Sequence, residues 1–269
     1  MARGFAEINV YMELFFRRYG REGDKPLIIL HGLFGLSDNW DSFARRFADE
    51  GFDVVVPDQR NHGRSGHSPV HSYEALCDDL LELIDKLGFD RISLLGHSMG
   101  GKAAMQFAFD HPESIDKLIV ADISPTTSGH NPQHEQLIDT MLGLDLQEYT
   151  SRSEVDKALE QQIKSRRIRQ FLTKNIYWKD KSSLGWRVNL EVVQENLGEI
   201  FREVGSPVPF EKPVLFLKGE KSDYVPDEAI RRIKELFPKA RIETIKNGTH
   251  WLHADNPEDF SAAVIFFLS

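Results

Sequence analysis

Short apolar runs alternate with stretches of helical periodicity along most of this chain. Runs in which nearly every residue is apolar are typical of strands buried on both faces of a parallel sheet. The periodic stretches between them would cover the sheet, so we predict an α/β fold with a mostly parallel central sheet flanked by helices. The expected strands are Val10–Arg17, Pro26–Leu30, Phe52–Val56, Arg91–Leu95, Ile115–Ile123, Pro213–Leu217 and Arg241–Ile245. The clearest helices are Trp40–Glu50, Ser72–Gly88, Gly100–Phe109 and Pro257–Leu268.

The stretch between Pro125 and Pro209 interrupts this alternation. It is rich in Gln, Lys and Arg, is mostly helical in pattern and has no strand-like apolar run. Because expected strands lie on both sides of it, it is an excursion from one domain rather than an independent domain. We expect residues 1–124 and 210–269 to form the core, and residues 125–209 to form an inserted helical cap.

The composition indicates a globular protein with a substantial core, since 41% of the 269 residues are hydrophobic and 28% are charged. A net charge of −9 disfavours nucleic acid and anionic membrane surfaces as partners. No segment approaches the roughly 18 apolar residues that a membrane span needs. The single cysteine, Cys77, suits a reducing compartment and lies in a helical apolar pattern. We expect a cytoplasmic monomer or homodimer in which Cys77 is a core residue.

Residues Gly96–Gly101 carry the clearest chemical motif. They read GHSMGG, which fits G-x-S-x-G, and they follow an apolar strand and open a helix of small residues. A serine on such a sharp strand-to-helix turn needs glycine neighbours, because side chains there would clash. Ser98 is therefore the expected nucleophile, and the backbone N–H of Met99 at the helix start is an expected oxyanion donor.

A second oxyanion donor should come from the loop after an earlier strand. Residues His31–Gly35, which read HGLFG, occupy that place, and the backbone N–H of Leu33 is the best candidate. An ordinary glycine turn would also explain Gly32 and Gly35, but not the presence of the other motifs.

A serine hydroxyl becomes a nucleophile when a neutral imidazole accepts its proton. Among ten histidines, His250 follows the last expected strand and precedes the last helix, so it can reach the carboxyl edge of the sheet. His253 is the alternative base. In folds with this serine motif the chain order is serine, acid, histidine. That order excludes His31, His62 and His97, which we expect to be supporting hydrogen-bonding groups.

The carboxylate that should orient this histidine has two candidates. Asp122 lies in Val120–Pro125, after the strand that follows the serine motif, and Asp223 lies in Gly219–Tyr224, after a later strand. Either aspartate lies between Ser98 and His250 in the chain. Asp223 follows the strand that usually carries the acid in folds with this serine motif. Either could also be an ordinary loop or helix-capping aspartate.

Six motifs together resemble those of α/β-hydrolase esterases, over nearly the whole chain. The likeness is greatest to the branch of the YbfF-type esterases and the ABHD11-type hydrolases. The motifs are HGLFG at 31–35, D-x-R-x-H-G-x-S at 58–65, GHSMGGK at 96–102, DISP at 122–125, G-x-H-W at 248–251 and WRVNL at 186–190.

The resemblance implies hydrolysis of small-molecule esters or thioesters through an acyl-enzyme on Ser98, without a cofactor or a metal. In this branch the DISP aspartate recurs, whereas the position of Asp223 is not always acidic, so Asp122 and Asp223 both remain candidates. Ser222 is expected to join their hydrogen-bond network. Asp58 and Arg60 are expected to brace the nucleophile turn by hydrogen bonds and ion pairing.

Specificity should depend on the cap. The basic run Lys164–Arg169 could bind the phosphates of an acyl-CoA, or could simply be a solvated helix face. Aromatic residues could line an acyl pocket, although such residues more often form the core of a cap. The candidates are Phe34, Tyr177, Trp178, Trp186, Phe201 and Trp251.

Two other kinds of function stay open at this point. The same triad could serve carbon–carbon hydrolysis or a lyase reaction. A non-catalytic small-molecule receptor could also keep the pocket, although an intact set of Ser98, His250 and a carboxylate argues against it. Dehalogenases and epoxide hydrolases are disfavoured, because they have an aspartate where Ser98 stands.

Overall fold

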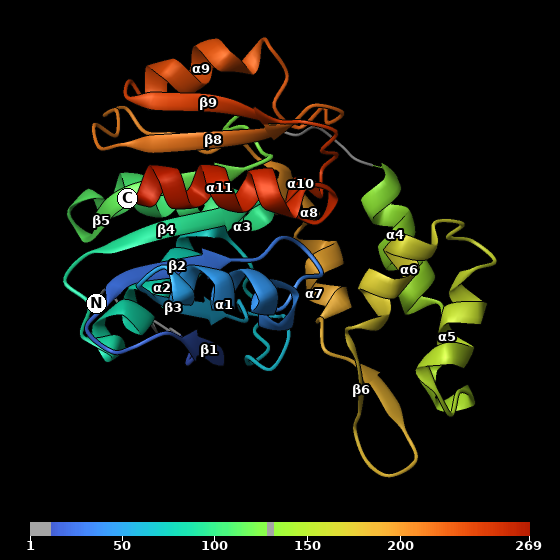
Figure 1. Ribbon diagram of the computed structural model, residues 1–269. Coiled ribbons are helices and arrows are strands. Elements are labelled where there is room, and N and C mark those ends of the chain that lie inside the picture. The colour runs from blue at the N-terminus through green and yellow to red at the C-terminus, as the bar shows by residue number, and fades with distance from the viewer. Residues whose placement is uncertain (1–11, 128–131) are drawn as a thin grey trace, which may run out of the picture.

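The computed structural model describes residues 12–127 and 132–269. The strands of its central sheet are β1 (Phe16–Tyr19), β2 (Lys25–Leu30), β3 (Phe52–Pro57), β4 (Ile92–His97), β5 (Ile115–Ala121), β8 (Val214–Gly219) and β9 (Ala240–Ile245). Their spatial order is β1-β3-β2-β4-β5-β8-β9 (Figure 1). Every neighbouring pair is parallel except β1 with β3. The predicted α/β fold with a mostly parallel sheet is confirmed.

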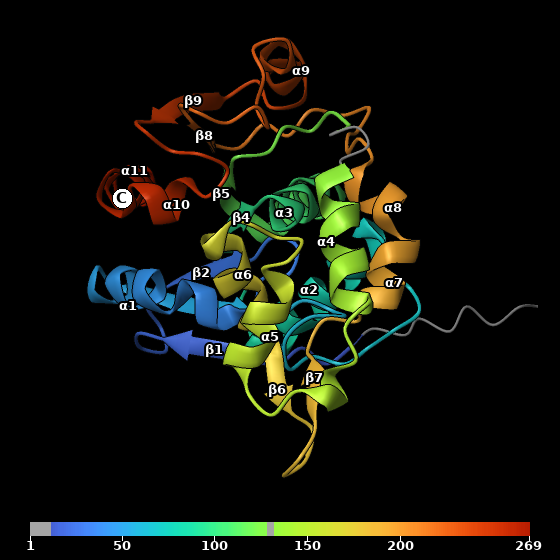
Figure 2. The same cartoon turned by 90° about the vertical axis from the view of Figure 1, so that its right-hand side faces the viewer.

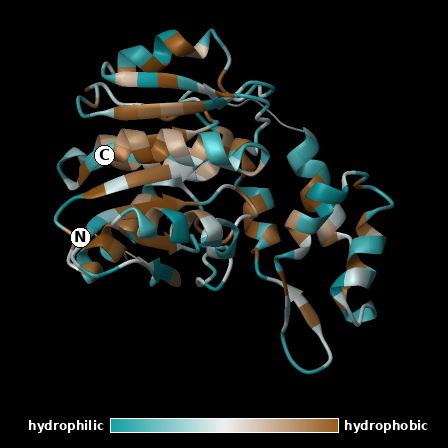
Figure 3. Ribbon diagram, in the orientation of Figure 1, coloured by the Kyte–Doolittle hydropathy of each residue, from teal (hydrophilic) through white to brown (hydrophobic). Residues whose placement is uncertain are grey.

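Helices cover both faces of the sheet, as Figure 2 shows along its edge. One face carries α1 (Asp41–Asp49) and α11 (Pro257–Leu268), and the other carries α2 (Tyr73–Leu87), α3 (Met99–Asp110) and α9 (Ala229–Leu236). Successive residues of a strand point to opposite faces. In β4, Leu94 therefore joins the core under α2 and α3, while Leu95 joins the core under α1 and α11. The middle strands are accordingly mainly hydrophobic (Figure 3).

The boundaries of α2 follow from its terminal residues. The Ser72 hydroxyl accepts a hydrogen bond from the backbone N–H of Ala75, and Gly88 ends the helix with a φ of 69°. A serine at the start and a left-handed glycine at the end are typical helix caps. Cys77 is buried on this helix, and its thiol donates to the carbonyl oxygen of Ala103 in α3.

The segment between β5 and β8 lies beyond the carboxyl ends of the strands, on the right in Figure 1. Its helices pack on the same hydrophobic core as α2 and α3. Its elements are α4 (Pro132–Leu142), α5 (Arg152–Leu159), α6 (Arg166–Thr173), β6 (Ile176–Trp178), β7 (Leu184–Trp186), α7 (Leu190–Glu195) and α8 (Leu197–Phe201). Shorter elements elsewhere are α10 (Leu252–Asp255) and the 3-10 helices η1 (Ser37–Trp40), η2 (Pro112–Ser114) and η3 (Leu146–Glu148).

Two details of the predicted elements are wrong. The segment contains an antiparallel hairpin, β6–β7, although no strand is predicted there. Three-residue strands are too short to show an alternating pattern. The first strand is predicted at Val10–Arg17 but runs from Phe16 to Tyr19, and the first residues of the predicted range lie outside the described part of the chain.

A buried ion pair joins the loop after β3 to α2. The Arg60 guanidinium donates to both carboxylate oxygens of Asp79, at 2.6 and 2.7 Å, and both side chains are buried. Asp58 accepts instead from the backbone N–H groups of Ser37 and Arg64. The side chains of Arg60 and Asp58, which are expected to brace the nucleophile turn, thus bond to α2 and to the loops after β2 and β3.

We predict that Arg60→Met lowers the free energy of unfolding by about 3–5 kcal/mol, because it leaves the carboxylate of Asp79 buried without its counter-ion. The matched change Arg45→Met removes an exposed pair with Asp41 and should cost less than about 1 kcal/mol. Urea unfolding of the two variants measures both values. Equal losses would contradict this account of the buried pair.

Candidate active site

The backbone at Ser98 has φ 55° and ψ −120°, between the end of β4 and the start of α3. L-residues rarely adopt this conformation, so the surrounding structure must hold it. A Cβ atom at Gly96 would lie 2.1 Å from the carbonyl oxygen of Gly100, and one at Gly100 would lie 2.5 Å from that of Leu30. Glycine is therefore required on both sides of the serine.

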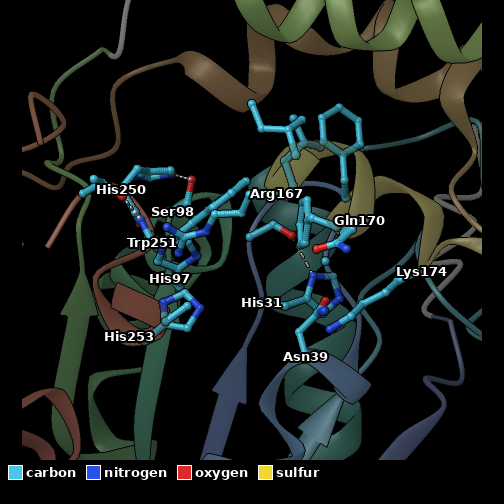
Figure 4. A pocket seen from close by; sticks show the side chains of 18 of the residues that line it. His31, Asn39, His97, Ser98, Arg167, Gln170, Lys174, His250, Trp251 and His253 are labelled. Carbon is cyan, nitrogen blue, oxygen red and sulfur yellow. Dashed lines mark hydrogen bonds between the residues drawn. The ribbon is translucent and has the colours of Figure 1, made fainter. Parts of the chain in front are cut away.

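Ser98, His250 and Asp122 form a continuous hydrogen-bonded chain (Figure 4 shows Ser98 and His250). His250 Nε2 lies 2.9 Å from Ser98 Oγ, and His250 Nδ1 lies 2.9 Å from Asp122 Oδ2. A carboxylate only accepts, so Nδ1 carries the proton and donates it. Nε2 is then left as the acceptor for the hydroxyl hydrogen of Ser98.

The carboxylate beside His250 belongs to Asp122, which follows β5 and is fully buried. Its Oδ1 accepts from the backbone N–H of Gly219 at 2.8 Å, and its Oδ2 accepts from the hydroxyl of Ser222. Asp223, the other candidate, is exposed in the turn after β8. The structure thus brings Asp122 and Ser222 to the histidine and leaves Asp223 outside this network.

The ring of Tyr224 stacks on the imidazole of His250, with the centroids 3.7 Å apart and the planes 19° apart. The carbonyl oxygen of Tyr224 accepts a hydrogen bond from the backbone N–H of Ser124, and the backbone N–H of Tyr224 donates to the hydroxyl of Ser222. The turn after β8 is thereby tied to the turn that carries Asp122. No sequence motif points to Tyr224, because the stacking depends on two loops meeting at the sheet edge.

Leu33, Ser98 and Met99 line one small cavity of about 10 Å³. Met99 is the first residue of α3, where backbone N–H groups have no partner within the helix. The loop that carries Leu33 passes close to the nucleophile, since a Cβ atom at Gly32 would lie 3.1 Å from Ser98 Cβ. The residues of the two expected oxyanion donors therefore lie close to the serine and line one cavity with it.

Buried side chains hold the loop that carries Leu33 in place through hydrogen bonds. His31 Nδ1 donates to the carbonyl oxygen of Gly32 at 2.9 Å, while its Nε2 accepts from the backbone N–H of Gln59 at 3.0 Å. The Gln59 amide donates to the carbonyl oxygen of His31, and His62 Nε2 accepts from the backbone N–H of Phe34. Gln59 is absent from the residues predicted from sequence, because an isolated glutamine gives no pattern.

His97 supports the site from another direction. Its Nε2 donates to the backbone carbonyl oxygen of His250 at 2.8 Å, and its ring packs against those of His250 and His253. Burial lowers the pKa of His97 to about 3 and that of His253 well below its ordinary value. Both rings are therefore neutral near pH 7, so neither places a positive charge beside His250.

A cavity of about 790 Å³ opens beside Ser98 (Figure 4). Phe34 and Trp251, two of the aromatic residues named from the sequence, line it, and α4 and α6 supply further apolar walls. The prediction is wrong for Tyr177, Trp178 and Trp186, which are not among the described lining residues, because β6 and β7 lie away from the sheet edge. Phe201 lines the small cavity instead.

Those three aromatic side chains have other surroundings. Trp178 is 51% exposed on the hairpin. The indole N–H of Trp186 donates to the carbonyl oxygen of Met141 at 3.2 Å, so this ring joins the packing between η3, α4 and the hairpin. The guanidinium of Arg187 lies 4.8 Å from the ring centre of Tyr177.

The basic run Lys164–Arg169 is divided between different surroundings. Lys164 and Arg166 are exposed, whereas Arg169 is buried against the carboxylates of Asp156 and Glu160. Arg167 reaches the cavity wall. The run is therefore not one continuous anion-binding face.

Within residues 12–127 and 132–269, no group of His, Cys, Asp or Glu side chains is arranged to hold a metal ion. No helix in these ranges is long and apolar enough to cross a membrane.

We predict that this protein loses stability steadily as the pH falls from about 6.5 to 4. Burial lowers the pKa of His31 to about 4 and those of His62, His71 and His97 to about 3. In the unfolded chain a histidine has a pKa near 6.5, so between these values the unfolded state binds more protons. This contribution to stability is complete above about pH 6.5 and is lost below it.

Urea unfolding midpoints at pH 7.5, 6 and 5 measure this loss. The variant His67→Gln, which changes an exposed histidine, should keep the same pH dependence. A midpoint that stays constant from pH 7.5 to 5 would show that the buried histidines are not held neutral.

Comparison with known proteins places these features in a family. Residues 25–142 match the family model of the alpha/beta hydrolase fold. The chain is 38% identical to "sn-1-specific diacylglycerol lipase ABHD11" of Danio rerio over 99% of this chain and 84% of that protein. It is 29% identical to "Esterase YbfF" of Escherichia coli over 93% of this chain and 95% of that protein.

A solved structure described as "Marine microorganism esterase" superposes with a TM-score of 0.92 at 42% identity, and the match covers 95% of this chain and 99% of the other. The motifs, the sheet order and these similarities agree. The chain belongs to the α/β-hydrolase fold family, in the branch that contains the ABHD11-type lipases and the YbfF-type esterases.

Proposed function

We propose that this protein is a serine-dependent carboxylic ester hydrolase that cleaves esters or thioesters of small to medium acyl groups. The observation that carries the proposal is the hydrogen-bonded chain of Ser98, His250 and Asp122 at the wall of a large cavity. Relatives of this chain are named esterases and lipases, which supports the same reaction class.

In the first half of the reaction, Ser98 Oγ attacks the carbonyl carbon while its proton passes to His250 Nε2. The carbonyl π electrons move to the oxygen, where the backbone N–H groups of Leu33 and Met99 would stabilise the charge. When the bond to the leaving group breaks, His250 returns the proton to the departing alcohol or thiol. The acyl group is then an ester of Ser98.

In the second half, water takes the place of the alcohol. His250 accepts a proton from the water as it attacks the acyl carbon, and then donates this proton to Ser98 Oγ when the acid product leaves. Asp122 holds the Nδ1 proton and stabilises the imidazolium in both halves. The donors Gly219 N and Ser222 Oγ keep its carboxylate oriented toward the histidine.

The segment 125–209 is proposed to act as the cap that sets specificity, because α4 and α6 form much of the cavity wall opposite the sheet edge. We also propose that the protein works in a reducing compartment such as the cytoplasm, as a monomer or homodimer and without nucleic acid. The one buried cysteine supports the reducing compartment, and the net charge of −9 supports the exclusion of nucleic acid.

We predict that wild-type protein hydrolyses p-nitrophenyl esters of graded chain length and that Ser98→Ala lowers kcat by about 10⁵ to 10⁶-fold, as loss of a triad nucleophile does. The matched control is Ser182→Ala, which changes an exposed serine of the β6–β7 turn and should leave the rate unchanged. Undiminished turnover by Ser98→Ala would exclude the mechanism. No turnover by wild type would favour a lyase or a receptor.

We predict that Asp122→Asn lowers kcat about 10⁴-fold, because an amide can no longer hold His250 in the required tautomer. Asp223→Asn should stay within about twofold of wild type, since its side chain is exposed. Steady-state rates of the two variants with one ester give the comparison. The opposite ranking would assign the acid to Asp223.

A further inference from the structure

The large cavity has a charge opposite to that of the whole protein. The chain carries 42 acidic and 33 basic residues. Among the described residues that line the cavity none is Asp or Glu, whereas Arg167 and Lys174 both line it. The local potential in a cleft depends on the charges at its wall more than on the distant net charge. The cavity therefore favours a negatively charged guest.

The two cations of the wall differ in their partners. The Arg167 guanidinium pairs with Asp255 and covers the ring of Trp251, with its carbon 4.7 Å from the ring centre. Asp255 also accepts from both the backbone N–H and the hydroxyl of Thr249. The charge of Arg167 is thus largely compensated within the protein.

Lys174 has no such compensation. It caps the end of α6, and no carboxylate lies within ion-pair distance of its ammonium among residues 12–127 and 132–269. In Figure 4 it lies with Gln170 and Asn39 on the side of the cavity away from Ser98 and His250. Asn39 Oδ1 accepts from the backbone N–H of Leu36, which leaves the Asn39 NH₂ group as a donor. An ammonium group and an amide NH₂ group, both hydrogen-bond donors, therefore lie at this end of the cavity.

Apolar side chains also line the cavity. These side chains come from the loop that carries Leu33, from α4 and from α6. They are Leu33, Phe34, Leu137, Ile168 and Phe171. A ligand that fits has a reacting carbonyl at one end, an apolar middle and an acceptor of hydrogen bonds at the other end.

We propose that the cavity selects esters that carry an anionic group, such as a carboxylate or a phosphate, remote from the bond that is cleaved, and that Lys174 is the residue that determines this specificity. The proposal rests on the proposed ester hydrolysis and names its substrate class. The side of the ester that carries the charge, acyl or alcohol, is an outcome of the test.

The test compares two matched pairs of substrates. In the acyl pair, p-nitrophenyl hexanoate is set against the p-nitrophenyl half-ester of adipic acid, in which a carboxylate replaces the terminal methyl group. In the alcohol pair, phenyl hexanoate is set against 4-carboxyphenyl hexanoate. Wild type should show a lower KM for the charged member of at least one pair, and the difference should shrink in high salt.

Lys174→Met should raise KM for that charged ester about three- to fivefold, the size of a solvent-exposed ion pair, and leave kcat and the neutral ester unchanged. Lys174→Arg keeps the charge and should retain most of the preference. Lys181→Met changes an exposed lysine in the β6–β7 turn, outside the described cavity lining, and should have no effect.

Equal KM values for charged and neutral esters in both pairs, or an equal effect of Lys174→Met on both members, would overturn the inference while leaving the esterase function intact. Failure to hydrolyse any of the four esters would overturn the proposed function, and the inference with it.

Discussion

The backbone turn at Ser98 is the constraint on which the site depends. Its φ of 55° lies in a region that side chains disfavour, so packing must hold it in place. That packing is possible because Gly96 and Gly100 let β4, α3 and the end of β2 approach closely. The same close approach carries the loop of Leu33 to the nucleophile. One strained residue thereby positions the hydroxyl and both expected oxyanion donors.

Parallel strands then bring together residues that are distant in sequence. Ser98 follows β4, Asp122 follows its neighbour β5, and His250 follows β9. All three lie at the carboxyl edge, because parallel strands end at the same edge. Since β5 pairs with β4 on one side and with β8 on the other, the turn after β5 lies between the nucleophile and the loop after β8. This central place explains how Asp122 can bind His250, Gly219 and Ser222 together.

The sequence predicts the features that local patterns encode. The buried strands, the capped helix α2, the turn at Ser98 and the position of His250 all follow from periodicity, glycine spacing and chain order. Asp122 and Asp223 cannot be separated in this way, because both follow strands and only their spatial order distinguishes them. The residues of the cavity wall cannot be predicted from local patterns either, because α4 and α6 reach the sheet edge through tertiary packing. For the same reason Tyr177, Trp178 and Trp186 are misplaced by a prediction based on residue type.

The net charge of the chain does not predict the charge of the residues that line the cavity. A net charge of −9 disfavours anionic macromolecules, because they meet the average field of the surface. A small molecule in the cavity meets a different electrostatic field. There the charge of Asp255 is compensated by Arg167, whereas the ammonium of Lys174 lines the cavity without a carboxylate partner among the described residues. The field of exposed acidic residues farther away than the Debye length, about 8–10 Å in physiological salt, is largely screened. A protein can therefore repel anionic surfaces and still prefer an anionic substrate.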